Sequence, residues 1–211
     1  VWKNPQKRKS IQEIEEMVES VLPDIDAISL TSGVLHSVLE EETYTLEVVR
    51  RLSRFDLPIG VSIYPLSDTS GRLKDAGATE VKYNLETATE ALFSIMCPGL
   101  CRDDALNALR AAVPVFGKDH VFSNIILGLG ETDEEMELCI ENLCKDGIIP
   151  VIRPLTPGGE LASNSSPSPK RIVQTARVHE EKLRKYGLNP KNSLTMCPSC
   201  TGCDLIPGRD T

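Results

Sequence analysis

The stretch VFSNIILGLGETDEEMELCIENLCKDGIIPVIRPL, residues 121–155, contains the signals for a strand, a helix and a second strand in succession. Residues 121–130 form an apolar run that ends in glycines, which predicts a buried strand leading into a loop. Residues 133–145 have apolar side chains at helical spacing, and residues 148–155 form a second apolar run. Two strands joined by a crossover helix lie parallel in one sheet, so this stretch predicts an α/β fold.

The same alternation extends toward the amino terminus. Ser10 is suited to cap a helix over residues 10–22, and Glu13 completes a capping box with it. Further strands are expected at residues 26–33, 59–64 and 79–86, and further helices at residues 43–55, 71–76, 89–95 and 102–115. Parallel strands in this order fit either an open doubly wound sheet or part of a (β/α) barrel, and both bind ligands at the carboxyl ends of the strands.

The carboxyl-terminal part of the sequence has a different character. Residues 156–170 are rich in Pro, Gly, Ser and Asn, which predicts a loop. Residues 169–186 have the spacing of an amphipathic helix, with Ser168 as its N-cap and Gly187 just beyond its end. Closely spaced cysteines follow, so we expect a helix and a cysteine-rich tail after the sheet.

The composition limits the classes of partner and the compartment. With 211 residues, 40% of them hydrophobic, the chain can build one core with or without an appendage. A net charge of −8 without a basic stripe argues against a nucleic-acid partner, and no apolar run approaches the roughly 20 residues that span a membrane. The seven cysteines are an odd number and no signal peptide opens the sequence, so we expect a cytoplasmic protein without a disulfide framework.

Candidate binding residues lie at the ends of the predicted strands. Glycines and small residues there let a ligand approach the backbone, and a rigid strand places polar side chains at the edge of the sheet. The candidates are Thr31, Ser32, Gly33, Asn84, Glu86, Gly128, Gly130, Glu131 and Arg153. The alternative is that these are ordinary turns, in which glycine serves the backbone geometry and Thr132 caps the next helix. We assign no catalytic side chain from the sequence.

Two segments in succession resemble a known family. YNLETATEALFSIMCPG, residues 83–99, and NIILGLGETDEEM, residues 124–136, are similar to segments of lipoyl and biotin synthases, which are radical S-adenosylmethionine (SAM) enzymes. The resemblance covers about residues 10–160 and implies a partial (β/α)6 barrel of parallel strands whose first strand and cluster loop are missing. It divides the chain into a barrel part, residues 1–155, and a part with the linker, helix and cysteine tail, residues 156–211.

The resemblance also assigns the candidate residues to parts of SAM. It implies that Thr31, Ser32 and Gly33 approach the methionyl amine, and that Asn84 and Glu86 contact the ribose and the methionyl group. It implies further that the adenine lies beside residues 128–131, with Gly128, Gly130 and Glu131 among them, and beside Ile152 and Arg153. The family has an arginine where this sequence has Cys97, so Arg102 or Arg153 becomes the candidate for the SAM carboxylate.

The family's cluster motif is the main departure. The Cys-x3-Cys-x2-Cys loop that binds the catalytic [4Fe-4S] cluster does not occur in these 211 residues, and by family order it precedes Ser10. Either that segment is not included in the sequence or the protein is a degenerate member without radical chemistry. We favour omission, because the strand ends retain residues suited to SAM.

The tail cysteines predict a metal site. Cys197, Cys200 and Cys203 have the two-residue gaps of ferredoxin-type ligands, which favours an iron-sulfur cluster with one iron open to another ligand. A zinc site, which requires four ligands, and unligated thiols are the alternatives.

The resemblance gives the site a function. It implies a lipoyl synthase-like radical SAM sulfurtransferase that uses SAM, the catalytic [4Fe-4S] cluster, and a second, auxiliary [4Fe-4S] cluster as sulfur donor. It implies an octanoyl-carrier protein or peptide as substrate and a second radical SAM subunit as partner. The alternatives are a radical SAM rearrangement or fragmentation enzyme of cofactor biosynthesis, and a non-catalytic iron-sulfur scaffold or partner subunit.

Overall fold

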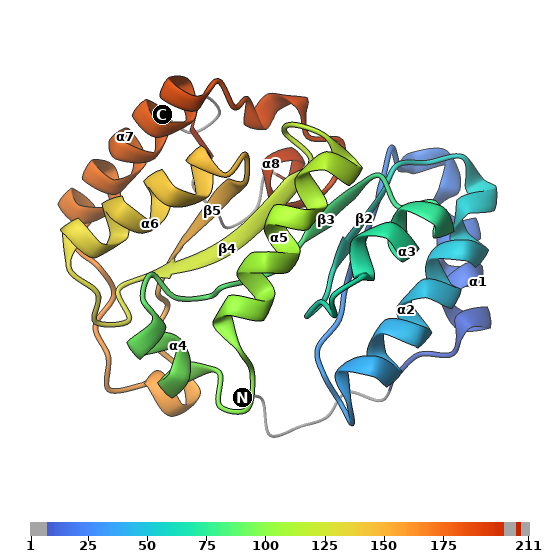
Figure 1. The fold of residues 1–211 in the computed structure, drawn as a ribbon. Helices are drawn as coiled ribbons and strands as arrows, with labels where there is room; N and C mark the ends of the chain where they lie inside the picture. The colour runs from blue at the N-terminus through green and yellow to red at the C-terminus, as the bar shows by residue number, and fades with distance from the viewer. Residues whose placement is uncertain (1–7, 201–205, 208–211) are drawn as a thin grey trace.

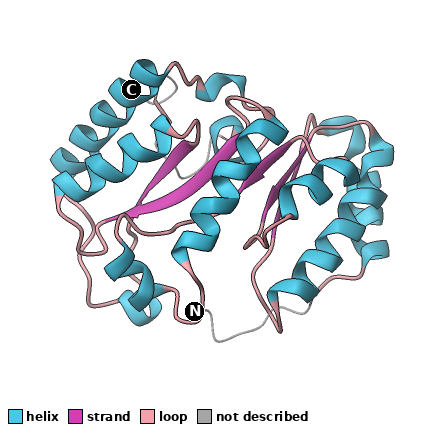
Figure 2. Ribbon diagram, viewed as in Figure 1, coloured by secondary structure: helices cyan, strands magenta, loops and turns pink. Residues whose placement is uncertain are grey.

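Over residues 8–200, 206 and 207, the part of the chain that the computed structural model describes, five strands form a single sheet. They are β1 (Ile28–Thr31), β2 (Ile59–Ser62), β3 (Glu80–Lys82), β4 (Val121–Leu127) and β5 (Ile149–Pro154). Their order in space is their order in sequence, and every neighbouring pair is parallel (Figure 2). A doubly wound sheet reverses its order at a switch point, whereas this sheet winds in one direction like the wall of a barrel. The predicted partial barrel of parallel strands is confirmed.

Helices connect the strands and continue beyond the last of them. They are α1 (Ile11–Val21), α2 (Val38–Leu52), α3 (Thr69–Ala76), α4 (Glu90–Met96), α5 (Arg102–Phe116), α6 (Asp133–Lys145), α7 (Pro169–Tyr186) and α8 (Met196–Ser199). Short 3-10 turns occupy Leu22–Asp24, Ser53–Phe55, Gly159–Leu161 and Pro190–Asn192. Figure 1 shows α3 and α5 in front of the strands and α8 behind them. None of the helices in the described ranges is long and apolar enough to cross a membrane.

Capping residues set several helix boundaries where the sequence predicts them. The Ser10 side chain accepts from the Glu13 backbone and the Glu13 side chain returns the contact, which confirms the capping box of α1. Helix α7 begins after Ser168 and ends at Gly187 in the left-handed conformation, as predicted. Helix α2 is a correction, since it begins at Val38 instead of residue 43. The Ser37 side chain caps it by accepting from Glu40, and the sequence prediction passed over this N-cap.

Strand β3 is shorter than the predicted strand at residues 79–86, because the pairing with its neighbours stops after Lys82. Beyond it, Glu86 makes a single parallel bridge to Ile125 of β4. Glu86 has a φ of 58°, which few residues other than glycine adopt and which interrupts regular strand geometry. The polypeptide nevertheless continues along β4 as far as the carboxyl edge of the sheet.

The two faces of the sheet differ in chemistry. The face toward the helices is apolar: Val61, Val81 and Ile125 are fully buried against residues such as Leu73 and Leu109. The opposite face, called the inner face below, is mixed: it includes Ser29, Gly60, Glu80, Lys82 and Asn124, together with the apolar Phe122 and Val151 in register with Lys82 and Asn124.

The carboxyl-terminal part joins this core. Leu183 of α7 and Leu188, Met196 and Ile206 beyond it are buried in the same hydrophobic cluster as the strands. These residues of the carboxyl-terminal part therefore pack with the residues of the sheet.

Candidate functional site

Polar side chains converge at the carboxyl edge where the chain leaves β3. The backbone N–H of Asn124 in β4 donates to Asn84 Oδ1 at 3.3 Å, and the Asn124 side-chain amide lies 3.5 Å from Glu86 Oε2. Two backbone hydrogen bonds hold the left-handed Glu86 in place, from its N–H to Asn124 O at 2.8 Å and from Ile126 N–H to its carbonyl at 2.9 Å. An unfavourable backbone conformation held in this way is typical of functional positions.

The buried carboxyl group of Glu86 is affected by nearby charges, among them that of the predicted site residue Arg153. Burial raises the pKa of the Glu86 carboxyl, while hydrogen bonds from Asn124 and Asn84 and the charges of Lys82 and Arg153 oppose that rise. Arg153 of β5 is in register with Ile126 of β4, whose N–H donates to the Glu86 carbonyl. The structure thus places Asn84, Glu86 and Arg153 on adjoining segments at this edge, and their contact with SAM stays a prediction.

Asn124 is a candidate that the sequence reasoning missed. It is only 5% exposed, and its Oδ1 is buried without a hydrogen-bond partner among the described residues. Buried polar atoms are almost always hydrogen-bonded, so this oxygen is suited to accept from a ligand. The signal was present in the strand residues VFSNIIL, where a single asparagine interrupts an apolar run.

The Gly-Leu-Gly-Glu turn after β4 is held by its own carboxylate. Glu131 accepts from the backbone N–H of Gly128 at 2.7 Å and of Leu129 at 2.9 Å, and Arg171 of α7 lies 3.0 Å from the same carboxylate. Gly128 and Gly130 have φ values of 107° and 124°, which explains the glycines. The structure thus gives Glu131 a role in the turn, and its contact with a nucleoside stays a prediction.

We expect Arg171→Met to lower the free energy of unfolding by about 2 kcal/mol. Arg171 is 23% exposed and its partner Glu131 is fully buried, so the loss is smaller than the roughly 3–5 kcal/mol for breaking a fully buried ion pair. Urea unfolding measures the change. The control is Arg184→Met, which removes an exposed pair with Glu180 and should change stability by less than about 1 kcal/mol. Equal effects of the two substitutions would refute the role of Arg171.

The turn after β1 is partly tied to the scaffold. Ser32 donates its backbone N–H to Ser62 O at 3.0 Å, and its hydroxyl donates to the buried carboxylate of Glu41 in α2. Thr31 and Gly33 are exposed, and a side chain at Gly33 would have no neighbour within 4 Å. This turn therefore leaves Thr31 and Gly33 accessible from solvent, whereas the Ser32 hydroxyl has a partner.

Cys97 lies near enough to Glu86 for that charge to affect its thiol, whereas Arg102 contacts Ala88 and α6. Burial raises the pKa of the Cys97 thiol, and the charge of Glu86 adds to the rise. Arg102 donates to Ala88 O at 3.4 Å and also contacts the buried Cys139 of α6. Two arginines were considered for the SAM carboxylate. The charge of Arg153 affects the Glu86 carboxyl, whereas Arg102 is hydrogen-bonded to Cys139 of α6.

The family follows from the sequence of this domain. The family model described as Radical SAM superfamily matches residues 2–143. The chain belongs to the radical SAM superfamily. Membership implies SAM and a [4Fe-4S] cluster as cofactors.

Solved radical SAM structures have the same fold. A structure of methylornithine synthase (PylB) matches with a TM-score of 0.68 and 20% identity, over 85% of this chain and 56% of that one. HydG from Carboxydothermus hydrogenoformans matches with a TM-score of 0.67 and 18% identity, over 85% and 46%. A domain of pyruvate-formate lyase-activating enzyme from Bacteroides vulgatus ATCC 8482 matches with a TM-score of 0.59 and 15% identity, over 78% and 97%. At these identities the likeness shows the fold alone.

The chain spans about half the length of the PylB and HydG structures that it matches. No curated protein matches the chain significantly by sequence.

The cysteines of this radical SAM domain do not fit the catalytic cluster. Cys97 and Cys101 have a three-residue gap, but Asp104 occupies the position where the motif needs its third cysteine. The orphaned Asn124 oxygen and the polar residues around it do fit SAM, whose ribose hydroxyls and amine are hydrogen-bond donors. The residues at the carboxyl edge are thus chemically suited to SAM.

The described start of the cysteine tail, residues 195–197, lies on the inner face of the radical SAM sheet. Lys82 Nζ donates to Cys197 Sγ at 3.3 Å, and Lys82 is 7% exposed. Cys200 is exposed, and its backbone N–H donates to Met196 O and Cys197 O, each at 3.1 Å. Cys203 lies outside the described residues. Within those residues no three His, Cys, Asp or Glu side chains are arranged to hold a metal ion, so the predicted cluster stays a prediction.

Proposed function

We propose that this chain is the SAM-binding barrel of a lipoyl synthase-like sulfur-insertion enzyme whose tail cysteines bind an auxiliary [4Fe-4S] cluster. The substrate in this proposal is an acyl chain on a carrier protein or peptide, and a second radical SAM subunit is the proposed partner. When bound, SAM with its catalytic cluster would supply a radical that abstracts hydrogen, and the auxiliary cluster would supply sulfide.

One observation carries the proposal, namely the position of Cys197 along β3. Lys82, which donates to Cys197, is in register with Phe122 of β4, and Asn124, two residues further along β4, contacts Asn84 and Glu86. Lys82 and Asn124 therefore belong to the same face of the sheet, because alternate residues of a strand face the same side. At about 3.3 Å per residue, Asn124 lies roughly 7 Å further toward the carboxyl edge than the position of Lys82.

In this proposal the two cofactors share the inner face of the sheet. A cluster on Cys197 would lie at the amino side of the inner face, and SAM would lie at the carboxyl edge of the same face. A substrate carbon placed between them would be within reach of both the radical and the sulfide. Sulfur insertion requires that proximity, whereas a rearrangement enzyme has no need for a second cluster.

The residues of the chain have distinct roles toward SAM in this proposal. Asn124 Oδ1 and the Glu86 carboxylate accept from hydroxyl or amine groups, and Asn84 supports Asn124 by accepting its backbone N–H. Arg153 provides a guanidinium for the SAM carboxylate. Gly128 and Gly130 keep side chains away from the backbone that the adenine approaches.

The proposal is tested by counting iron and sulfide in the anaerobically reconstituted protein, with Mössbauer spectra to identify the cluster. Because these 211 residues lack Cys-x3-Cys-x2-Cys, a cubane bound by a protein of this sequence reports on other cysteines. We expect about four iron and four sulfide per chain, and loss of both when Cys197, Cys200 and Cys203 are all replaced by alanine.

The matched control is the double replacement Cys97→Ala and Cys101→Ala, which should keep the full iron content. Zinc in place of iron, or a cubane that survives in the triple variant, would contradict the auxiliary cluster. Iron lost equally from the triple variant and from the control would also contradict it, because the cluster would then depend on both cysteine groups.

A further inference from the structure

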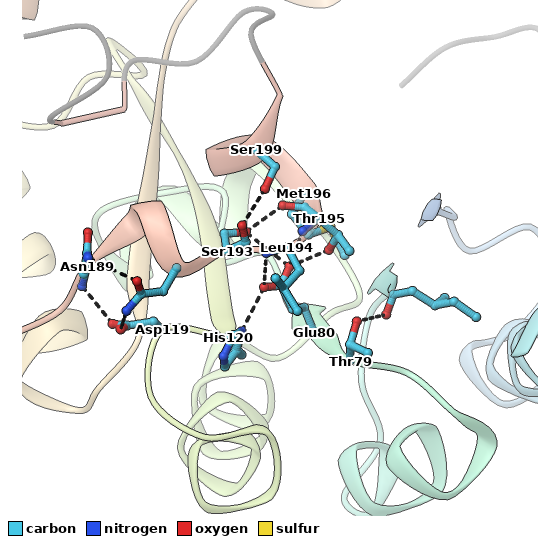
Figure 3. A network of polar contacts seen from close by, with 12 residues as sticks. Thr79, Glu80, Asp119, His120, Asn189, Ser193, Leu194, Thr195, Met196 and Ser199 are labelled. Atoms are coloured by element: carbon cyan, nitrogen blue, oxygen red, sulfur yellow. Dashed lines mark hydrogen bonds and ion pairs between the residues drawn. The ribbon is translucent and has the colours of Figure 1, made fainter. Parts of the chain in front are cut away.

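A buried carboxylate on β3 fastens the segment that leads to the cysteines. Glu80 is fully buried, and four donors from residues 193–195 converge on it (Figure 3). Leu194 N–H donates to Oε1 at 2.7 Å, and Thr195 donates to Oε2 through its N–H at 2.8 Å and its hydroxyl at 2.5 Å. The Ser193 hydroxyl lies 3.2 Å from Oε2, and His120 Nδ1 lies 2.9 Å from Oε1.

These contacts make Glu80 and the segment mutually dependent. A buried carboxylate is costly unless hydrogen bonds compensate for the lost water, and most of its donors here come from residues more than 110 positions later in the sequence. Removal of the segment would leave a buried charge with His120 as its remaining partner among the contacts above. Glu80 in turn satisfies the backbone N–H groups of Leu194 and Thr195.

Neighbouring contacts set the path of the segment under the sheet. Before it, Asp119 accepts from Asn189 N–H at 2.8 Å and from the Asn192 amide at 2.7 Å. After it, Met196 N–H donates to Ser29 Oγ of β1 at 3.1 Å. The chain thus passes from the start of β4 across β3 toward β1, and Cys197 comes to rest beside Lys82.

We propose that Glu80 is a positioning residue for the tail cluster, because it holds residues 193–195 on the inner face and so orients Cys197 before metal binds. The cluster in this statement rests on the proposed function above. Many small metal sites order only when the metal arrives, and their binding energy is then spent on folding. When the first ligand is already held in place, less of the metal-binding free energy is used to order the chain, so the site binds metal more tightly.

Glu80→Gln tests the docking without any metal. The amide keeps the size of the side chain but presents NH2 to groups that are themselves donors. In metal-free protein we expect hydrogen exchange at residues 194–196 to accelerate at least about tenfold. We also expect faster alkylation of Cys197. Unchanged exchange and alkylation would overturn the proposal, whether or not any cluster binds.

Reconstitution then tests the link to the cluster. Iron content per folded chain should fall to less than about half in Glu80→Gln, since the ligand set is no longer preorganised. Full iron content with a wild-type EPR spectrum, despite accelerated exchange, would overturn the positioning role. Wild-type protein without a cubane would instead refute the proposed function, and the metal-free exchange data would still decide whether Glu80 docks the segment.

Two variants protect the test against simple unfolding. Thr195→Val removes one of the donors and should give the same changes at about a third of the size, with a shifted EPR spectrum of the cluster that remains. Glu42→Gln is the matched control, because Glu42 is also fully buried and accepts from Thr69 and Arg72 away from the tail. It should lower overall stability and leave the exchange of residues 194–196, relative to the core, and the EPR spectrum unchanged.

Discussion

Gly60→Val is expected to displace residues 193–197 from the inner face of the sheet. A Cβ at Gly60 would lie 2.0 Å from Thr195 Oγ1 and 2.7 Å from Met196 Cε, far inside contact distance. The backbone of Gly60 cannot retreat, since it is in register with Ser29 of β1 on one side and Glu80 of β3 on the other. The segment therefore has to move.

The expected result is large and local. A clash of this kind costs about 1–3 kcal/mol, so the exchange protection of residues 194–196 should fall by about 5- to 150-fold. Mass spectrometry of exchanged peptides measures it. Cluster iron should be lost together with the protection if the tail holds the cluster.

The control is Gly158→Ala, where a Cβ would meet nothing within 4 Å and φ is 174°, so alanine fits. It should leave exchange in the tail unchanged. A Gly60→Val protein that retains wild-type protection at residues 194–196 would show that the segment does not lie against β2 in solution.

The prediction for Gly60 shows what the sequence could not reveal. A glycine in a predicted strand indicates a close approach by another group, but it does not identify the group. The neighbour, Thr195, is separated from it by most of the chain. Contacts between distant segments depend on the complete topology, and the tail was predicted only as a cysteine cluster.

Local signals were more informative. Helices α6 and α7 begin and end at the predicted residues, because their caps and glycine are encoded beside them. The sequence TEVKYNLE, residues 79–86, which includes β3, also has charged or amide side chains at every second position, a pattern typical of a strand. What could not be read is that Glu80 and Lys82 contact the tail while Asn84 and Glu86 contact residues at the carboxyl edge.

The sequence reasoning missed Asn124 because it looked for site residues only after the predicted strands. That choice suits loops that bind ligands, but it leaves out residues inside a strand. Asn124 lies within β4, in register with Val151 of β5, and only the structure shows that its Oδ1 has no hydrogen-bond partner in the part of the chain that is described. A strand interior supplies a rigid contact of this kind, whereas turns such as residues 31–33 supply accessible backbone.

Asn124→Leu is expected to weaken SAM binding by about tenfold or more while leaving stability within about 1 kcal/mol of wild type. The Asn124 Oδ1 has no hydrogen-bond partner among the described residues, and the contact of the Asn124 amide with Glu86 is long, at 3.5 Å, so an apolar side chain of similar size costs little there. The same oxygen, once it accepts a hydrogen bond from SAM, contributes about 1.4 kcal/mol for each tenfold of affinity.

A loss of SAM affinity without a matching loss of stability separates a ligand-binding role of Asn124 from a structural one. Calorimetric titration with SAM and urea unfolding are compared for Asn124→Leu, for Glu86→Ala and for the control Asn142→Leu, which changes an exposed asparagine on α6. Glu86→Ala should also weaken SAM binding, and Asn142→Leu should change neither quantity beyond about 0.5 kcal/mol. If Asn124→Leu unfolds the protein at lower urea yet binds SAM as wild type does, its amide serves the fold, and the SAM site must be sought away from β4.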